Sequence, residues 1–198
     1  MGLRRNGRTV APPGKGVGMK DFRVRKPAEI KDNPFTAIGK RWMLIAAGSP
    51  ERYNMMTASW GAFGVLWHRD VCFCFLRPQR YTREFVEKEA FFTLSFFDDR
   101  YKKVLNLCGS RSGRDIDKMM AAGLTAFAPL AARAGLRGRQ DRHRAVAFRE
   151  ARLILVCRKI YHQDILPGNF VDPRIGDNYP QKDYHRMYVG EVMRCLTK

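Results

Sequence analysis

Three arginines lie close together in RPQRYTREF, residues 77–85, where a predicted buried strand ends and a predicted helix begins. Arg77, Arg80 and Arg83 are positive where the helix dipole is already positive, which is unfavourable unless an anion binds there. A phosphate would fit, because Thr82 offers a hydroxyl, the first helical amides offer donors and an arginine can hold two phosphate oxygens. A solvated basic turn, paired with glutamates of the same helix, explains the spacing equally well.

A second loop rich in small residues follows in LCGSRSGRD, residues 107–115. Gly109, Ser110, Ser112 and Gly113 surround Arg111, and such loops let backbone amides approach an anion. The loop has neither the GxGxxG fingerprint nor the Walker spacing, so it indicates neither a dinucleotide-binding fold nor a P-loop. An ordinary loop is the commoner explanation for one such segment. Two anion-friendly loops in one small domain favour a phosphorylated cofactor.

The predicted strand NMMTASWGAFG, residues 54–64, places Thr57, Ala58 and Ser59 beside Trp60. A flat aromatic ligand needs a shallow backbone surface with a few polar donors, which these small residues could provide. Ordinary strand packing fits the same pattern, and the pattern alone favours it.

The histidines do not form a metal site by their spacing, because no HExxH or Cys-His pattern is present. No GxSxG elbow or nucleophile–base pair is found either. His185, in DYHRMYVGE, is the histidine whose polar and aromatic neighbours suit the edge of an active site. A structural histidine is the commoner explanation.

The five cysteines are odd in number and scattered, which predicts free thiols and a reducing compartment. No apolar run approaches the ~18 residues of a membrane span, and the N-terminus lacks the apolar stretch of a secretory signal. These features predict a cytoplasmic protein without a membrane association.

Short apolar runs bearing aromatic and β-branched residues alternate with turns over most of the chain. They predict strands over residues 42–47, 55–60, 71–76, 91–96, 148–161 and 185–196, and helices over residues 81–89, 101–107 and 114–122. Few long helices separate the strands, which favours an antiparallel sheet or barrel over a doubly wound parallel sheet.

A chain of 198 residues with 45% hydrophobic residues is long and apolar enough to form one domain with a substantial core. Residues 1–18 have a basic, Gly- and Pro-containing composition that predicts a flexible tail, and we interpret Met19 as the natural start. The domain then covers residues 19–198. Within it, residues 125–146 are Ala- and Arg-rich without a clear period, which indicates either a variable basic loop or a translated frameshift.

The formal net charge of +18 raises the possibility of a nucleic-acid partner. Much of the excess lies in the basic N-terminal segment and in residues 133–152, and no nucleic-acid-binding motif accompanies it. We therefore do not expect nucleic acid to be the partner. Tight, salt-sensitive binding that survives deletion of residues 1–18 would favour that alternative.

Seven segments, in order from about Lys26 to Lys198, together resemble the flavin reductase family and its flavoredoxin-like branch. They are NPFTAIGKRWMLIAAG, NMMTASWGAFGVLW, RPQRYTREFVEK, FTLSFFDD, LNLCGSRSGRDIDK, ARLILVCRKIY and DYHRMYVGEV. The resemblance implies a mainly β domain with short helices, an FMN-binding split β-barrel with Greek-key antiparallel strands. It also implies a homodimer with FMN near the subunit interface.

The resemblance further implies a cofactor site assembled from four segments. Residues 57–60 would lie along the isoalloxazine, residues 77–82 would hold the phosphate, residues 108–113 would form another loop near the cofactor, and His185 would lie near the flavin as the candidate catalytic residue. The implied FMN-binding residues are Thr57, Ala58, Ser59, Trp60, Arg77, Arg80, Tyr81, Thr82, Cys108, Gly109, Ser110, Arg111, Ser112 and Gly113.

The function that this resemblance implies is an oxidoreductase that takes hydride from NADH or NADPH through bound FMN. The electrons would pass to a free flavin, a metal chelate or a redox protein. A flavin-binding electron carrier without nicotinamide turnover is an alternative, and failure of NADH or NADPH to bleach the flavin would favour it.

Overall fold

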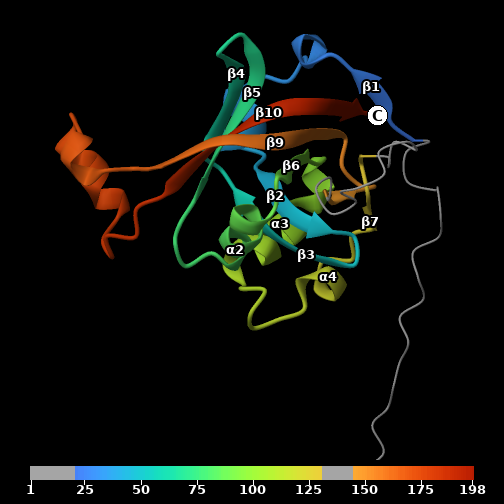
Figure 1. The fold of residues 1–198 in the computed structure, drawn as a ribbon. Coiled ribbons are helices and arrows are strands. Elements are labelled where there is room, and N and C mark those ends of the chain that lie inside the picture. The colour runs from blue at the N-terminus through green and yellow to red at the C-terminus, as the bar shows by residue number, and fades with distance from the viewer. Residues whose placement is uncertain (1–20, 131–144) are drawn as a thin grey trace, which may run out of the picture.

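The structure is a computed structural model that describes residues 21–130 and 145–198. Its main sheet has the strand order β3-β2-β6-β9-β10-β5-β4, and β1 pairs with the far half of β10. All of the pairings are antiparallel (Figure 1). The strands are β1 (Arg23–Arg25), β2 (Met43–Ser49), β3 (Arg52–Ala58), β4 (Gly61–Leu66), β5 (Arg69–Leu76), β6 (Phe91–Phe96), β9 (Leu153–Asp164) and β10 (Arg186–Thr197).

Short helices lie between these strands. They are α1 (Pro34–Gly39), α2 (Tyr81–Lys88), α3 (Lys102–Ser110) and α4 (Lys118–Ala121), together with short 3₁₀ turns. The start of α1 follows from sequence, because the Asn33 side chain accepts the amide of Phe35 and Pro34 takes the first helical position. Helices α2, α3 and α4 all contact β3, the edge strand of the main sheet.

Each strand that the sequence predicts is present, with its bounds shifted by a few residues. Strand β4 is an addition as a separate strand, because its two glycines weaken the strand signal in GAFGVL. The helix predicted over residues 114–122 is shorter than expected. Residues 112–116 form a turn in which the Ser112 carbonyl accepts two amides, and α4 begins only at Lys118.

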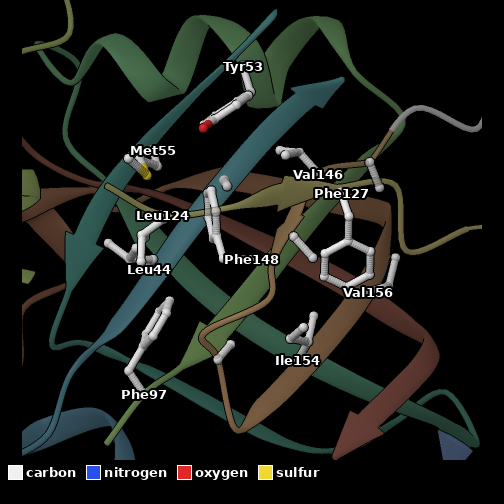
Figure 2. Close-up of a cluster of buried hydrophobic side chains, with 14 of the residues drawn as sticks. Leu44, Tyr53, Met55, Phe97, Leu124, Phe127, Val146, Phe148, Ile154 and Val156 are labelled. Carbon is white, nitrogen blue, oxygen red and sulfur yellow. The ribbon is translucent and has the colours of Figure 1, made fainter. Parts of the chain in front are cut away.

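Apolar side chains are buried on both faces of β2, which explains why that strand is a continuous apolar run and not an alternating one. Leu44 and Ala46 face one core and Met43 and Ile45 face the other. Figure 2 shows the first of these cores, where side chains of β2, β3 and β9 meet Phe148 and its neighbours. The second core fills the space enclosed by β2, β5, β6, β9 and β10.

The two ends of the unusual segment 125–146 join the first core. Strand β7 (Ala126–Phe127) pairs with β8 (Ala147–Phe148), and Phe127 stacks on Phe22. Val146 is fully buried and its carbonyl accepts the Thr93 hydroxyl. The centre of this segment, residues 131–144, and the proposed tail of residues 1–18 lie outside the described residues.

Strand β9 extends beyond β6, and the part of β10 that faces this extension also pairs with β5. Residues 153–158 of β9 pair with β6, whereas its farther half pairs only with β10. The connection between β9 and β10, the orange segment at the left of Figure 1, projects from the body of the domain. It exposes apolar side chains, including Leu166 and a completely exposed Val171. We call residues 159–185 the arm.

All five cysteines are buried and free, which confirms the prediction of thiols. The Cys72 and Cys157 sulfurs lie 3.1 Å apart inside the second core, and burial raises the pKa of Cys157 well above its usual value. Such thiols are packing groups rather than reactive ones. Within residues 21–130 and 145–198, every helix is too short or too polar to cross a bilayer.

Candidate functional site

Residues 57–60 lie where β3 ends and the chain turns into β4. Ala58 is buried, whereas Ser59 and Trp60 are exposed, with 43% of Trp60 accessible. The Thr57 hydroxyl donates to the carbonyl of Leu105 in α3. This segment therefore combines an anchored strand with an indole and a hydroxyl that remain open to a ligand.

Trp60 meets His185, so the structure brings together two residues that are 125 positions apart. Their ring centroids are 5.0 Å apart. The Tyr179 hydroxyl lies 3.0 Å from Nδ1 of His185, and the Tyr179 ring also packs against Trp60. Tyr179 belongs to the arm, and no local sequence pattern marked it. The three rings form an aromatic wall beside the end of β3.

The imidazole of His185 is neutral at physiological pH. Only 8% of the residue is exposed, and burial, followed by the positive charge of Arg77, lowers the pKa of His185 to about 4. Nδ1 is bound to Tyr179, and Nε2 has no hydrogen-bond partner among the described residues. A neutral histidine can donate or accept a hydrogen bond, but it cannot supply a positive charge to a ligand at neutral pH.

Arg77 binds residues of the arm. Its guanidinium donates to Asp183 at 2.6 Å and to the carbonyl of Asn178 at 2.9 Å, and it lies over the ring of Tyr179. The hydrogen bonds from Arg77 and Gln79 lower the pKa of Asp183. Arg77 thus holds the residues that carry Tyr179 and His185, and its charge is already paired with a carboxylate.

Arg80 occupies the N-cap position of α2 and differs from Arg77 in its partners. Its Nη1 donates to the carbonyl of Gly109 at 2.6 Å, and it forms no ion pair with a carboxylate of the described residues. Burial, followed by the charge of Arg77, lowers the pKa of Arg80. No carboxylate of residues 21–130 and 145–198 therefore neutralises the positive charge at this helix mouth.

The next two residues of the predicted phosphate turn have other surroundings. Thr82 is 1% exposed, and its hydroxyl accepts the side-chain amide of Asn54, so it faces the interior. Tyr81 packs edge-on against Phe85 and lies beneath the guanidinium of Arg114. Only the backbone amides of these two residues are placed to serve the helix mouth.

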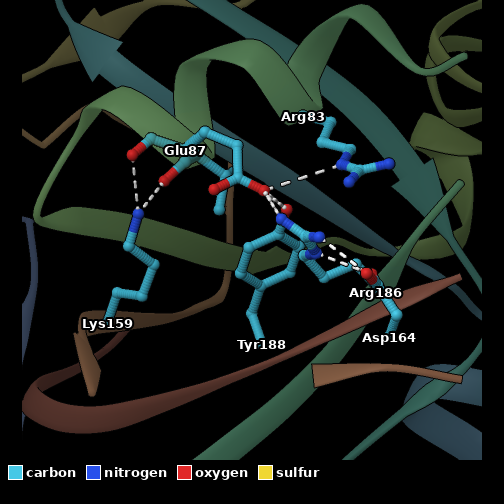
Figure 3. Close-up of polar contacts among 7 residues, drawn as sticks. Arg83, Glu87, Lys159, Asp164, Arg186 and Tyr188 are labelled. Atoms are coloured by element: carbon cyan, nitrogen blue, oxygen red, sulfur yellow. Dashed lines mark hydrogen bonds and ion pairs between the residues drawn. The ribbon is translucent and has the colours of Figure 1, made fainter. Parts of the chain in front are cut away.

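Arg83 points away from the helix mouth towards Glu87 (Figure 3). The Glu87 carboxylate also accepts Arg186 and the hydroxyl of Tyr188, while Lys159 donates to the carbonyls of Val86 and Glu87. Arg186 is held in turn by Asp164. These contacts fasten the C-terminal end of α2 to β9 and β10. We call Arg83, Glu87, Lys159, Asp164, Arg186 and Tyr188 the Glu87 cluster.

The loop over residues 108–113 lies against β3 at two places. A Cβ atom at Gly109 would lie 3.3 Å from the Thr57 side chain, and one at Gly113 would lie 2.3 Å from the Asn54 side chain. Gly113 therefore lets the loop approach β3 more closely than any other residue would. Cys108 is buried, and burial raises its pKa to about 11. That thiol is therefore part of the packing.

The polar side chains of the same loop are exposed or bound locally. The Ser110 hydroxyl donates to Asn106, and the Ser112 hydroxyl accepts the amide of Arg114. Arg111 is exposed and has no side-chain partner among the described residues. The loop thus places one free guanidinium and short hydroxyl side chains beside the end of α3.

Lys118 is a site residue that sequence reasoning missed. It is 5% exposed, and its ammonium donates to the carbonyl of Cys108 at 2.7 Å and to that of Met55 at 3.1 Å. Burial lowers the pKa of Lys118, and the nearby Arg80 lowers it further. No sequence signal marked Lys118, because the predicted helix begins at residue 114 and would place Lys118 in its second turn, whereas α4 begins at Lys118.

A cavity of about 460 Å³ lies between β3, α2 and the turn that leads into α4. Asn54, Tyr81, Gly113, Arg114 and Lys118 are among its lining residues. Trp60 and His185 do not line it. The cavity therefore adjoins the first turn of α2 and is not lined by the aromatic wall. No cluster of metal-binding side chains occurs within the described residues.

The antiparallel sheet, the closed second core and the extended arm define the fold as a split β-barrel, which confirms the predicted fold class. Among solved structures, the chain resembles a flavoredoxin from Methanosarcina acetivorans at 19% identity, with a TM-score of 0.57 over 80% of this chain and 68% of the other. It also resembles an FMN-binding domain of a flavin reductase-like enzyme from Shewanella baltica at 18% identity, with a TM-score of 0.59 over 89% of this chain and 76% of the other.

A third similar structure is an NADH:FAD oxidoreductase from Streptomyces globisporus, solved with NAD and FAD fragments. It shares 12% identity, with a TM-score of 0.53 over 80% of this chain and 75% of the other. No family model matches the sequence, and no curated protein matches it. The structural likeness establishes the fold, and the proteins that share it come from the group that the sequence motifs resemble.

Proposed function

We propose that this protein is an FMN-dependent oxidoreductase of the flavin reductase type. The observation that carries the proposal is the pairing of two features at one end of the barrel. One is the aromatic wall of Trp60, Tyr179 and His185. The other is a group of cations beside the mouth of α2 that have no carboxylate partner in the part of the chain that the structure describes. A planar aromatic ring with a phosphate tail has both of the complementary features.

The residues present suit FMN, with some changes from the roles that the sequence suggests. Trp60 and Ser59 would face the ring, and Arg80, the first amides of α2 and the 109–113 loop would face the phosphate. Arg77 instead holds the arm, and Thr82 supports Asn54. Both contribute to the shape of the site rather than to direct phosphate contacts.

Bound FMN would accept hydride from NADH or NADPH and pass electrons to a free flavin, a metal chelate or a redox protein. The protein's own contribution is to bind, orient and tune. Burial raises the pKa of Tyr179, so its hydroxyl keeps its proton and shares a hydrogen bond with Nδ1 of His185, whose direction follows from the imidazole tautomer. His185 is therefore a neutral hydrogen-bonding group at the site.

The direct test is the visible spectrum of the purified protein after incubation with FMN and removal of free ligand. We expect a bound flavin spectrum that bleaches when NADH or NADPH is added without oxygen. A colourless protein that takes up no FMN would refute the proposal. The acceptor is then identified by adding free flavin, a ferric chelate or an oxidised redox protein to the reduced sample.

The second candidate is an electron carrier that binds FMN but does not react with nicotinamides. It has specific support, because the similar structures include flavoredoxins as well as the NADH:FAD oxidoreductase. Stopped-flow mixing separates the two functions. A flavin that dithionite reduces, but NADH and NADPH do not, identifies the carrier.

We also propose that the protein is a cytoplasmic homodimer. Support for the dimer comes from apolar side chains exposed on the arm and on the β4–β5 hairpin, among them Val65, Trp67 and Leu166. Support for the compartment comes from the five buried free thiols. Light scattering after gel filtration measures the mass, and a monomer at micromolar concentration would contradict the dimer.

A further inference from the structure

Lys118 carries a buried charge that no carboxylate of the described residues neutralises. Its two hydrogen bonds go to backbone carbonyls, that of Cys108 at the end of α3 and that of Met55 on the open edge of β3. The neighbouring Asp117 is turned elsewhere, because its carboxylate accepts the amide of Met120 at the start of α4. Buried ammonium groups normally have an anionic partner.

Arg80 repeats this arrangement on the next carbonyl. Lys118 donates to Cys108 and Arg80 donates to Gly109, so two cations from different elements bind consecutive carbonyls at the C-terminal end of α3. The two carbonyls belong to neighbouring residues, and the charge of Arg80 contributes to lowering the pKa of Lys118. Two like charges this close oppose each other unless an anion joins them.

The end of α3 cannot neutralise both charges. A helix C-terminus is equivalent to about half of a negative charge. The two full positive charges of Arg80 and Lys118 therefore leave a surplus of roughly one and a half charges, part of it buried. A phosphate monoester carries up to two negative charges and would balance this surplus.

We propose that Lys118, together with Arg80, is the residue pair that makes this site select the phosphorylated flavin, FMN, over riboflavin. The inference rests on the proposed function, because it assumes that a flavin binds at the aromatic wall. It adds a specificity-determining residue outside the 77–82 and 108–113 segments. Lys118 also fixes the distance between α3 and β3, and so between the two sides of the site.

The experiment compares the dissociation constants of FMN and riboflavin for the wild type and Lys118→Met, measured by quenching of flavin fluorescence. Methionine keeps the length and removes the charge. We expect FMN binding to weaken by about tenfold or more, and riboflavin binding to change by less than about twofold. Raising the salt concentration should weaken FMN binding to the wild type more than to the variant.

Two further variants separate charge from structure. Lys118→Arg keeps the charge and should retain most of the preference for FMN. Lys102→Met is the matched control, because Lys102 is the first residue of α3 as Lys118 is of α4, and it also donates to a backbone carbonyl, that of Lys40. Its ammonium lies over Trp42, away from the site. It should leave both dissociation constants unchanged.

The outcomes are distinct. Equal weakening for FMN and riboflavin, or no weakening, would overturn the role of Lys118 while leaving the proposed function intact. A wild type that binds neither flavin would refute the proposed function itself, before any variant is made. If Lys118→Met does not fold, Lys118→Arg and the salt dependence of the wild type test the inference instead. A wild-type preference for FMN over riboflavin that salt does not reduce overturns it.

Discussion

Cations lie beside both ends of α2, but they have carboxylate partners at one end and bind backbone carbonyls at the other. At the C-terminal end, Arg83, Arg186 and Lys159 surround Glu87, and Asp164 adds a second carboxylate (Figure 3). At the N-terminal end, Arg80 is bound only to a backbone carbonyl, as Lys118 is nearby. A cluster whose cations have carboxylate partners stabilises the fold, and one whose cations lack them is suited to bind a ligand.

The largest expected effect that tests this comparison is the pH dependence of stability near His185, which faces Tyr179, Arg77, Asp183 and, farther off, Arg80. Its folded pKa of about 4 lies below the unfolded value of 6.5. Between these pH values His185 is protonated in the unfolded chain but not in the folded protein. Stability should therefore fall by about 2 to 3 kcal/mol as the pH drops from 6.5 towards 4.

Urea unfolding followed by fluorescence at several pH values measures this loss, and His185→Gln is the control, because it removes the titrating group. The variant should show a clearly smaller slope between pH 6.5 and 4.5. Carboxylates such as Glu87 and Asp183, whose pKa values are lowered, contribute mainly below that window. If the two proteins have the same slope, His185 is not held in its neutral form.

Removing the Glu87 carboxylate from the Glu87 cluster should affect stability and not ligand binding. Glu87→Ala leaves Arg83 and the hydroxyl of Tyr188 without their acceptor, and we expect a loss of about 1 to 2 kcal/mol, because one third of the Glu87 side chain is exposed. Glu84→Ala is the matched control. Its pair with Arg114 is on the surface, so it should cost about 0.5 kcal/mol or less.

The same Glu87→Ala protein should bind FMN within about twofold of the wild type, since the mouth of α2 is at the other end of the helix. Urea unfolding gives the stability and fluorescence quenching gives the affinity. A tenfold loss of affinity with normal stability would contradict the division between a structural end and a binding end.

Arg80→Met should have the converse effect. We expect FMN to bind about tenfold more weakly, equivalent to about 1.4 kcal/mol, because a charge in a half-buried site beside a dianion is lost. Riboflavin should be affected much less. Titration of both flavins measures the difference. If the variant prefers FMN over riboflavin as strongly as the wild type does, the phosphate does not bind at this end of α2.

The fold was accessible from sequence because its strongest signals are local. The apolar runs of β2, β5, β6, β9 and β10 are long enough to identify strands, and the order of the motifs pointed to the split barrel. Strand β4 lacked such a signal. Its exposed positions and two glycines depend on pairing with β5 for their conformation.

The site was only partly accessible, because its geometry depends on contacts between distant segments. The charge argument placed arginines at the mouth of α2, yet it could not distinguish Arg77, which pairs with Asp183, from Arg80, which does not. Tyr179 and Lys118 became visible only when the arm and α4 were placed against β3. The spacing of residues in the sequence identifies charged side chains, but only the three-dimensional structure shows which groups they bind.

The smallest expected effect concerns Arg111, which shares the surplus charge but is exposed. Its guanidinium has no side-chain partner among the described residues, so removing it cannot leave an unpaired group behind. Because solvent and salt screen an exposed charge, Arg111→Met should weaken FMN binding by no more than about twofold at physiological ionic strength. Titration at low salt should enlarge the effect. A tenfold loss of FMN affinity that salt does not reduce would mean that Arg111 contacts the phosphate directly. Exposure would then not decide which cations beside the mouth of α2 bind the ligand.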